Sequence, residues 1–229
     1  MPRAQLTIAE EDAMRRRLAD AALDIYRSEG LEALSFRRLA DAMDLSHTLP
    51  YRYFPHKEAL LVAMRIDCTL RLTQFLRERE PLHAPLLTRI RAIAAAYVEY
   101  ARRNAAEYLL IFSTHQPPPD RYPELLAARR AMFDHAVEVL ALCVQAGVLH
   151  GEPRQLAHEY WIALHGLMTL HVANQLVHGR TLDQLVEPLI DRMLGHAGIA
   201  SKAAKPAAKS AAKSIVRAKP GSRATRSRR

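Results

Sequence analysis

The sequence predicts an all-α protein, and three observations favour that class. Hydrophobic residues make up 49% of the 229 positions but aromatic residues only 6%, which suits an aliphatic helical core. The chain has only 8 Gly, too few for the many tight turns of a large all-β fold. Apolar residues recur at helical spacing, and no stretch of strand length alternates with a period of two. We expect about nine helices, which form a small N-terminal three-helix domain and a larger C-terminal helical bundle.

The first predicted helix begins after Thr7 and runs to about Ser28. Thr7 and Glu10 have the spacing of a capping box, in which each side chain accepts a backbone N–H of the first turn. Gly30 favours the positive φ that commonly ends a helix. The positions that face the predicted core are Leu18, Ala21, Ala22 and Ile25.

Two short helices follow within residues 35–60, and a turn at Asp44 separates them. Ser35 is a good N-cap, so the second helix is expected to begin at Phe36. Asp tolerates a positive φ better than most residues other than Gly, which suits a tight turn between two steeply crossing helices. The core-facing positions of this second helix are Phe36, Leu39, Ala40 and Met43.

The third predicted helix begins after Ser46, which we expect to be its N-cap, and it carries Tyr51, Arg52 and Tyr53. Pro50 removes one backbone donor from the first turn, so we expect this helix to be short or slightly distorted. Two short helices joined by a turn, with a compact second helix, are the layout of a helix-turn-helix DNA reader. In that motif the second helix enters the major groove.

Six further segments of helical periodicity complete the predicted fold. Prolines and glycines separate them, and Asn104 and Thr181 are expected to cap two of them. The predicted helices span residues 56–79, 86–103, 104–115, 122–147, 154–178 and 181–194.

Residues 8–60 resemble the N-terminal domain of the TetR family of bacterial transcriptional regulators. The matching positions are the opening helix RRRLADAALDIYRSEG, Leu31–Ser35, Leu39-Ala40, Leu45-Ser46, Tyr51–Phe54 and Lys57–Leu60. Two positions depart from the family pattern, because Asp44 stands where Gly is usual and Pro50 where an aliphatic residue is usual. The resemblance implies a dimeric repressor with a small-molecule pocket.

The candidate DNA-binding residues lie in and around the predicted recognition helix. Aromatic hydroxyls at its end, and an ammonium at the start of the next helix, can reach DNA phosphates. In the family, the residues that match Tyr51, Tyr53 and Lys57 make such contacts; the alternative is that a tyrosine packs in the core. The candidates are Ser35, Arg37, Ser46, His47, Thr48, Leu49, Tyr51, Arg52, Tyr53, His56 and Lys57.

Trp161, His165 and Gly166 form a W-x-x-x-H-G pattern in the segment 154–178. The pattern resembles a subgroup of TetR-family C-terminal domains marked by Trp, His and Gly. Amphipathic aromatic groups in the middle helices predict an apolar effector pocket with a few polar tips, and ordinary core filling is the alternative. The candidate pocket residues are Tyr97, Tyr100, Tyr108, Phe112, Phe133, Trp161 and His165.

The resemblance also implies a homodimer, because in this family the last two long helices pair across a two-fold axis to form a four-helix bundle. Gly166 would allow close approach of two helices there. The candidate interface residues are Leu164, Gly166, Leu167, His171, Leu182, Leu185, Leu189 and Met193.

The net charge of +9 is concentrated at the C-terminus. Residues 201–229 contain ten Lys or Arg and no Asp or Glu, so residues 1–200 carry 23 basic and 24 acidic residues. This segment has almost nothing apolar to bury, and we expect a disordered tail that either tethers DNA or is only solvated. The predicted domains are a helix-turn-helix domain at 1–57, an effector-binding and dimerisation domain at 58–198, and the basic tail at 199–229.

Other classes of protein are disfavoured. Cys68 and Cys143 lie in apolar helical patterns, which suits buried thiols in a reducing cytoplasm rather than disulfides. The uncharged run 160–179 contains three His, Asn174 and Gln175, too many polar groups for a membrane span. The histidines lack ligand spacing, and no nucleophile elbow, Gly-rich phosphate loop or CxxC occurs, so we expect no metal, no cofactor and no enzyme activity.

The favoured function is a DNA-binding transcriptional regulator of the bacterial cytoplasm, associated with the nucleoid. We expect a homodimeric repressor that a small hydrophobic effector releases from a palindromic DNA operator. One alternative is a nucleoid-type DNA-binding protein dominated by its basic tail. Another is a helical small-molecule-binding protein or enzyme with a vestigial reader.

Overall fold

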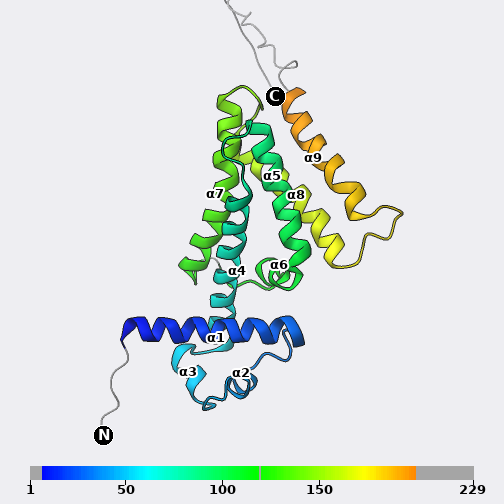
Figure 1. Ribbon diagram of the computed structural model, residues 1–229. Coiled ribbons are helices and arrows are strands. Elements are labelled where there is room, and N and C mark those ends of the chain that lie inside the picture. Colours follow the sequence, from blue (N-terminus) through cyan, green and yellow to red (C-terminus); the bar gives the residue numbers. More distant parts are fainter. Residues whose placement is uncertain (1–6, 119, 200–229) are drawn as a thin grey trace, which may run out of the picture.

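The computed structural model describes residues 7–118 and 120–199, and within these ranges it contains nine α-helices and no strand (Figure 1). The predicted all-α fold is confirmed, whereas the predicted basic tail lies outside the described residues. The helices are α1 (Ile8–Glu29), α2 (Phe36–Ala42), α3 (Leu49–Tyr53), α4 (Lys57–Arg79), α5 (Leu86–Arg103), α6 (Ala105–Phe112), α7 (Pro123–Gln145), α8 (Pro153–Val172) and α9 (Leu182–Ile199).

The helices form two parts that share α4. Helix α1 lies across one end of the molecule with α2 and α3 beneath it, and we call these three helices the reader (Figure 1). Helix α4 begins beside the reader and rises into the second part, where it packs against α5, α6 and α7. Helices α5–α9 form the bundle, and α9 ends at the side of the bundle farthest from the reader (Figure 1). Helix α4 therefore joins the two parts.

The predicted caps of the first two helices are confirmed. The Thr7 N–H donates to the Glu10 carboxylate at 2.8 Å, and the Glu10 N–H donates to the Thr7 hydroxyl at 3.3 Å, which completes the capping box. The Ser35 hydroxyl accepts the Arg38 N–H at 3.1 Å. At the turn, Asp44 adopts a φ of 52°, the left-handed conformation that the sequence suggested.

The third helix is short, as predicted, but its N-cap residue differs from the prediction. Helix α3 spans five residues with Pro50 in its first turn, and its N-cap residue is Thr48 rather than Ser46. The Ser46 carbonyl accepts the Leu49 N–H at 2.9 Å in a tight turn. Pro50 has no N–H with which to continue that pattern as an α-helix, so the helix begins later. The Ser46 hydroxyl instead bonds to the Thr48 hydroxyl at 2.8 Å.

Two later boundaries were predicted wrongly. Helix α8 ends at Val172 and not at residue 178, because Asn174 adopts a φ of 56° and Gln175 donates back to the Leu170 carbonyl at 2.7 Å. This arrangement is a left-handed C-terminal cap that ends the helix without Gly. Helix α9 continues through Gly195 to Ile199 instead of ending near residue 194.

Helix α6 also differs from its prediction, because it ends at Phe112 and not at residue 115. Asn104 precedes it but makes no side-chain cap, and its amide donates to the Tyr100 carbonyl at 3.2 Å instead. The carbonyl groups at the C-terminal end of α6 are bonded by side chains from elsewhere, which include Arg65 of α4. Because side chains donate to these carbonyl groups, α6 can end here without leaving them unpaired.

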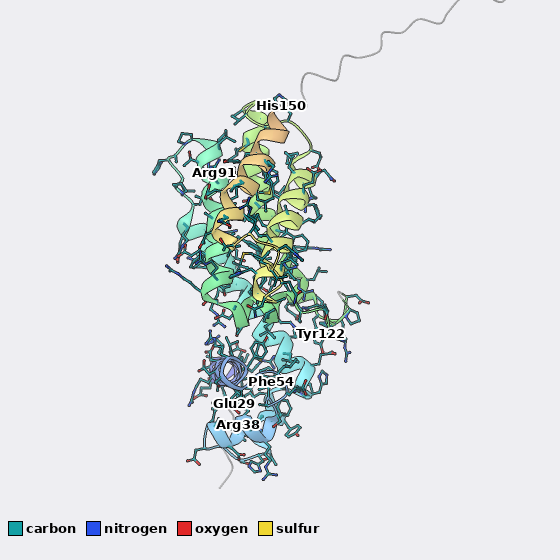
Figure 2. The ribbon with its side chains drawn as sticks, turned by 90° about the vertical axis from the view of Figure 1, so that its right-hand side faces the viewer. Glu29, Arg38, Phe54, Arg91, Tyr122 and His150 are labelled. Carbon is teal, nitrogen blue, oxygen red and sulfur yellow. The ribbon has the colours of Figure 1, made fainter. Side chains whose placement is uncertain are left out.

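The core is aliphatic and continuous from the reader into the bundle. Phe54, which follows α3, is fully buried between the two parts, and Figure 2 shows it at their junction. Cys68 and Cys143 are buried free thiols, and burial raises the pKa of Cys68 to about 11, so little thiolate exists at neutral pH. Among the described residues, no helix has the length and apolar character that crossing a membrane requires.

Candidate DNA-binding surface and effector cavity

Tyr51 is the most prominent side chain on the outer surface of α3. It is 60% exposed, and its ring packs edge-on against Phe36 of α2 with centroids 4.6 Å apart. The contact holds the base of the ring while the rest stays open to solvent. A large exposed aromatic side chain with a hydroxyl, held in place by a core residue, suits contact with a phosphate.

His56 and Lys57 lie where α4 begins. His56 is the N-cap, and its Nδ1 accepts the Ala59 N–H at 3.1 Å, which leaves its other ring nitrogen free to donate. The exposed Lys57 ammonium donates to the Leu31 carbonyl at 3.1 Å, so it is held beside the reader. An ammonium has further donors beyond this one, and a DNA phosphate can accept them.

The remaining polar candidates differ in how far they are already bonded. Ser35 caps α2, and His47 bonds to Asp41 at 2.7 Å. Arg38, a neighbour of the exposed Arg37, is paired with Glu29 at 2.6 Å, and Figure 2 shows this pair on the reader. The polar candidates exposed on the reader are Ser35, Arg37, Ser46, His47, Thr48, Arg52, His56 and Lys57, whereas Leu49 is half-buried against the core.

Tyr53 packs in the core, which was the alternative to a contact with DNA. It is 9% exposed and forms part of the core, and its carbonyl accepts a hydrogen bond from Arg15 of α1 at 2.5 Å. Its neighbour Arg52 shares a surface hollow with Tyr53, Arg15 and two acidic residues of α1, Glu11 and Asp12. The structure thus favours Tyr51 over Tyr53 as a DNA contact.

Two adjoining cavities lie within the bundle. The inner cavity, of ≈ 80 Å³, is almost entirely apolar. It is lined by Leu76, Ile90, Ile93, Ala94, Tyr97, Met132, Phe133, Ala136, Leu140, Ala157, Tyr160, Trp161, Leu164, Ile190, Met193 and Leu194. The outer cavity, of ≈ 400 Å³, is lined by Ile111, Phe112, Ser113, Gln116, Arg129, Arg130, Met132, Phe133, Arg154, Trp161 and His165. Met132, Phe133 and Trp161 line both, so these three side chains form the wall between them.

Polar groups are few at this wall, and they form one small cluster. The Tyr108 hydroxyl bonds to His165 Nδ1 at 2.6 Å, and the Tyr97 hydroxyl lies 3.2 Å from both. Burial lowers the pKa of His165, so the imidazole is neutral at neutral pH, and its ring stacks on Trp161 at 5.4 Å. The Trp161 indole N–H is buried and makes no well-formed hydrogen bond among the described residues, although the Tyr97 hydroxyl is close enough to interact with it. A bound molecule would offer this buried donor a better acceptor.

Most of the predicted pocket residues come together. Tyr97, Phe112, Phe133, Trp161 and His165 line the cavities, and Tyr108 contacts them through His165. Tyr100, which was also predicted to line the pocket, lines neither of these two cavities. Its hydroxyl donates to Glu107 at 2.6 Å instead, and its ring packs on Phe75. Tyr97 and Tyr100 are three positions apart on α5 and so lie on adjacent faces, which the spacing of aromatics alone did not separate.

Glu107 is a buried carboxylate that the sequence pattern did not predict. It is 4% exposed, and it accepts hydrogen bonds from Arg27 of α1, Arg71 of α4 and Tyr100 of α5. Burial alone would raise its pKa, but the Tyr100 and Arg27 hydrogen bonds and the nearby arginine charges lower it. The available signal was the single acidic residue in the otherwise apolar helix AAEYLLIF. Glu107 thus links the reader to the bundle.

Arg65 on α4 is a second missed residue, 5% exposed inside the bundle. It donates to the Leu110 carbonyl at 3.2 Å, the Ser113 hydroxyl at 3.1 Å and the His115 carbonyl at 3.0 Å. The Gln116 amide bonds to the same region, at 3.0 Å from the Ile111 carbonyl. Arg65 and Gln116 together hold the C-terminal end of α6, and Gln116 also lines the outer cavity.

The predicted dimer residues lie mostly inward. Leu164, Leu167 and Leu182 are at most 8% exposed in the protomer core. His171, Leu185, Leu189 and Met193 are half-buried, and Gly166 is exposed. The outward stripe of α8 is instead Ile162, Gly166 and Leu170, in which Ile162 is 64% and Leu170 47% exposed. A Cβ added at Gly166 would meet no atom of this chain within 4 Å.

Comparison with known proteins agrees with this architecture. The family model for bacterial regulatory proteins of the tetR family matches residues 18–64, and that for a tetracyclin repressor-like C-terminal domain matches residues 90–193. No curated protein matches the sequence. The Trp-His-Gly subgroup stays a prediction.

Several solved structures share the fold. A protein of unknown function from Rhodococcus sp. RHA1 has a TM-score of 0.72 and 25% identity over 86% of this chain and 99% of its own. The TetR family transcriptional regulator PfmR from Thermus thermophilus has a TM-score of 0.60 and 18% identity over 78% and 97%. The transcriptional regulator FadR from Bacillus subtilis, in complex with stearoyl-CoA, has a TM-score of 0.65 and 14% identity over 82% and 99%.

The two family models match successive parts of one architecture, in which the first covers most of the reader with the start of α4 and the second covers most of the bundle. The chain therefore belongs to the TetR family of bacterial regulatory proteins and is a helix-turn-helix transcriptional regulator.

Proposed function

We propose that the protein is a homodimeric repressor that leaves a palindromic operator when a small molecule occupies the bundle cavity. The observation that carries the proposal is that α4 extends from the reader to the inner cavity. Its first residue, Lys57, lies beside the reader, and Leu76 near its other end lines the inner cavity. One rigid helix therefore touches both the DNA-binding surface and the cavity, so a ligand that favours another position of α4 also favours another position of the reader.

The proposed domains follow from the same helix. Residues 1–57 contain the reader, residues 58–198 contain the effector-binding and dimerisation domain, and residues 199–229 form the basic tail. The ion pair of Glu107 with Arg27 strengthens the connection across the first boundary. The DNA target places the protein in the bacterial cytoplasm, at the nucleoid. We propose no catalytic role.

The direct test selects protein-bound DNA from a random-sequence pool. A dimeric repressor is expected to enrich a palindrome whose half-sites lie about one helical turn apart, ~10 base pairs centre to centre. Adding a ligand that occupies the cavity should then release that DNA. Failure to enrich any sequence would favour either a nucleoid-type DNA-binding protein or a small-molecule-binding protein with a vestigial reader.

Replacing Tyr51 with Phe, or Lys57 with Ala, should weaken operator binding by about tenfold, because each reader loses one charge-assisted phosphate contact. The slope of log affinity against log salt should fall by about 0.9 per reader for Lys57→Ala, or about 1.8 for a dimer. The measurement is a salt titration of operator affinity by fluorescence anisotropy.

Arg38→Ala is the control for these two variants. It removes a positive charge from the same reader, but Glu29 already pairs with that charge. We expect a smaller change in both affinity and salt slope. Melting temperatures should stay close to the parent for Tyr51→Phe and Lys57→Ala. Unchanged operator affinity in both would remove Tyr51 and Lys57 from the DNA-binding surface.

Deleting residues 201–229 separates the repressor from a nucleoid-type protein. The deletion removes ten positive charges, each of which releases counterions when it meets a phosphate. We expect a large loss of affinity for random DNA and a small loss for the selected operator. Equal losses for both DNAs would mean that the tail, and not the reader, carries binding.

A further inference from the structure

The outer cavity has positive charge that the protein itself leaves unneutralised. Three arginines line it, namely Arg129, Arg130 and Arg154. Arg154 pairs with Asp134 at 2.7 Å. Within residues 7–118 and 120–199, no carboxylate forms an ion pair with Arg129 or Arg130. The half-buried Arg129 donates to the side-chain oxygen of Gln116, a neutral group, and burial lowers its pKa.

A third unpaired cation lies close behind them. Arg65 is 5% exposed and donates only to neutral oxygens, those of Leu110, Ser113 and His115. Burial, and then the charge of Arg129, lower its pKa by more than Tyr26 and Glu58 raise it, and Glu58 forms its ion pair with Arg121 instead. Elsewhere the buried charges are matched, since Glu107 has two arginine partners and Glu80 has Arg89. A buried charge without a counterion, such as Arg65, is costly, and the half-buried Arg129 and the exposed Arg130 add unpaired positive charge at the cavity itself, so an anion is the occupant that fits this charge.

The other side of the same space is apolar. Past Met132, Phe133 and Trp161 lies the inner cavity, with Ile93, Leu140 and Ile190 on its walls. Met132 is flexible and can move aside for a ligand. A molecule that fills both cavities therefore needs an apolar chain at one end and a negative charge at the other.

We propose that the effector is an amphipathic carboxylate, whose charged end lies against Arg129 and Arg130 and whose aliphatic chain passes Trp161 into the inner cavity. This inference rests on the proposed effector site and replaces a purely hydrophobic effector with an anionic one. A carboxylate fits because its two oxygens can accept from one planar guanidinium, and a second guanidinium can bind beside it.

The contacts of Arg129 also suit an indirect effect of such a ligand on α4. A carboxylate that binds Arg129 competes with the Gln116 oxygen for its donors. The other end of the Gln116 amide bonds to the carbonyls of Ile111 and Ser113 at 3.0 and 2.9 Å, at the end of α6 that Arg65 holds. Once its oxygen leaves Arg129, Gln116 is free to move with the end of α6, and Arg65 of α4 bonds to that same end.

The test measures binding to the full-length protein alone, by the emission of Trp161, the only Trp of the chain. The probes are decanoate, decanol and decyl phosphate. We expect decanoate to bind at least about tenfold more tightly than decanol, and its affinity to fall as salt rises. Arg129→Gln and Arg130→Gln should each weaken decanoate by about tenfold or more, and Arg129→Lys by less.

Arg154→Gln is the matched control, because Arg154 lines the same cavity but is already paired with Asp134. It should leave decanoate affinity within about threefold of the parent. If the Arg129→Gln protein does not fold, as judged by circular dichroism, decanoate binding is tested with Arg130→Gln, because Arg130 is exposed. Equal binding of decanol and decanoate, no binding of decanoate, or no effect of Arg130→Gln would overturn the inference. Tighter binding of decyl phosphate would overturn the choice of carboxylate in favour of a phosphate.

DNA release is measured separately, so the two proposals can fail independently. If decanol releases the operator as well as decanoate does, the repressor function stands and the anionic effector falls. If decanoate binds through Arg129 and Arg130 but the operator stays bound, the ligand class stands and the inducible switch falls.

Discussion

Replacing Glu107 with Ala is expected to lower the free energy of unfolding by about 2–4 kcal/mol, the largest single-residue loss of stability that we predict. The carboxylate is buried and accepts from Arg27, Arg71 and Tyr100. Its removal leaves the buried Tyr100 hydroxyl without an acceptor. The two arginines are 42% and 41% exposed, so they can turn toward solvent, which keeps the loss below that of a fully buried charge pair. Urea denaturation measures the change.

The same carboxylate makes stability depend on pH. The folded state lowers the pKa of Glu107 from 4.5, so its contribution is complete above pH 4.5 and is lost as the pH falls through the folded value. Glu107→Gln keeps the shape but not the charge. The difference in unfolding free energy between parent and Glu107→Gln should therefore be largest near pH 6–7 and should shrink toward pH 3.

Glu99→Gln is the control for this prediction. Glu99 also pairs with two arginines, Arg79 and Arg103, but its side chain is 35% exposed. Solvent screens such a pair, and we expect a loss of less than about 1 kcal/mol. Equal losses of unfolding free energy for Glu99→Gln and Glu107→Gln would show that the buried Glu107 stabilises the fold no more than an exposed ion pair does. Because Glu107 connects α1 to the bundle, its variants should also weaken the effect of any effector on operator affinity.

Replacing Gly166 with Leu is expected to break the proposed dimer while the protomer stays folded. Within the protomer the position is exposed, so an added Cβ meets no atom of another element within 4 Å, and a helical Gly costs about 1 kcal/mol relative to Ala. An exposed helical Gly between the exposed Ile162 and Leu170 suits the close approach of a second copy. The two-fold axis would double the cost, since each new side chain opposes the partner.

The expected size follows from overpacking. A misfit of about 1–3 kcal/mol per site, counted twice, weakens dimerisation by about 2–6 kcal/mol, or roughly thirtyfold to twenty-thousandfold. Sedimentation velocity across a dilution series measures it, and operator affinity should fall in parallel because one reader binds only a half-site. Glu138→Leu on α7 is the control, since it adds the same side chain at an exposed position of another helix. A Gly166→Leu dimer as stable as the parent would place the interface elsewhere.

The sequence alone determined the local features of the reader. The Thr7 capping box, the Ser35 cap, the positive φ of Asp44 and the short α3 all depend on groups within a few residues of one another. Such interactions are readable from spacing, because the chain fixes which groups can meet. The all-α class followed from helical periodicity, which is likewise a local property of the chain.

Tertiary structure decided what depends on distant partners. Glu107 is 80 residues from Arg27 and 36 from Arg71, and no local pattern pairs them. The end of α6 is held by Arg65 from 45 residues away. Helix α8 is apolar on more than one face, so periodicity could not tell whether Leu164 or Ile162 pointed outward. The neighbours decided it, because α5, α7 and α9 cover the first face and leave Ile162, Gly166 and Leu170 exposed.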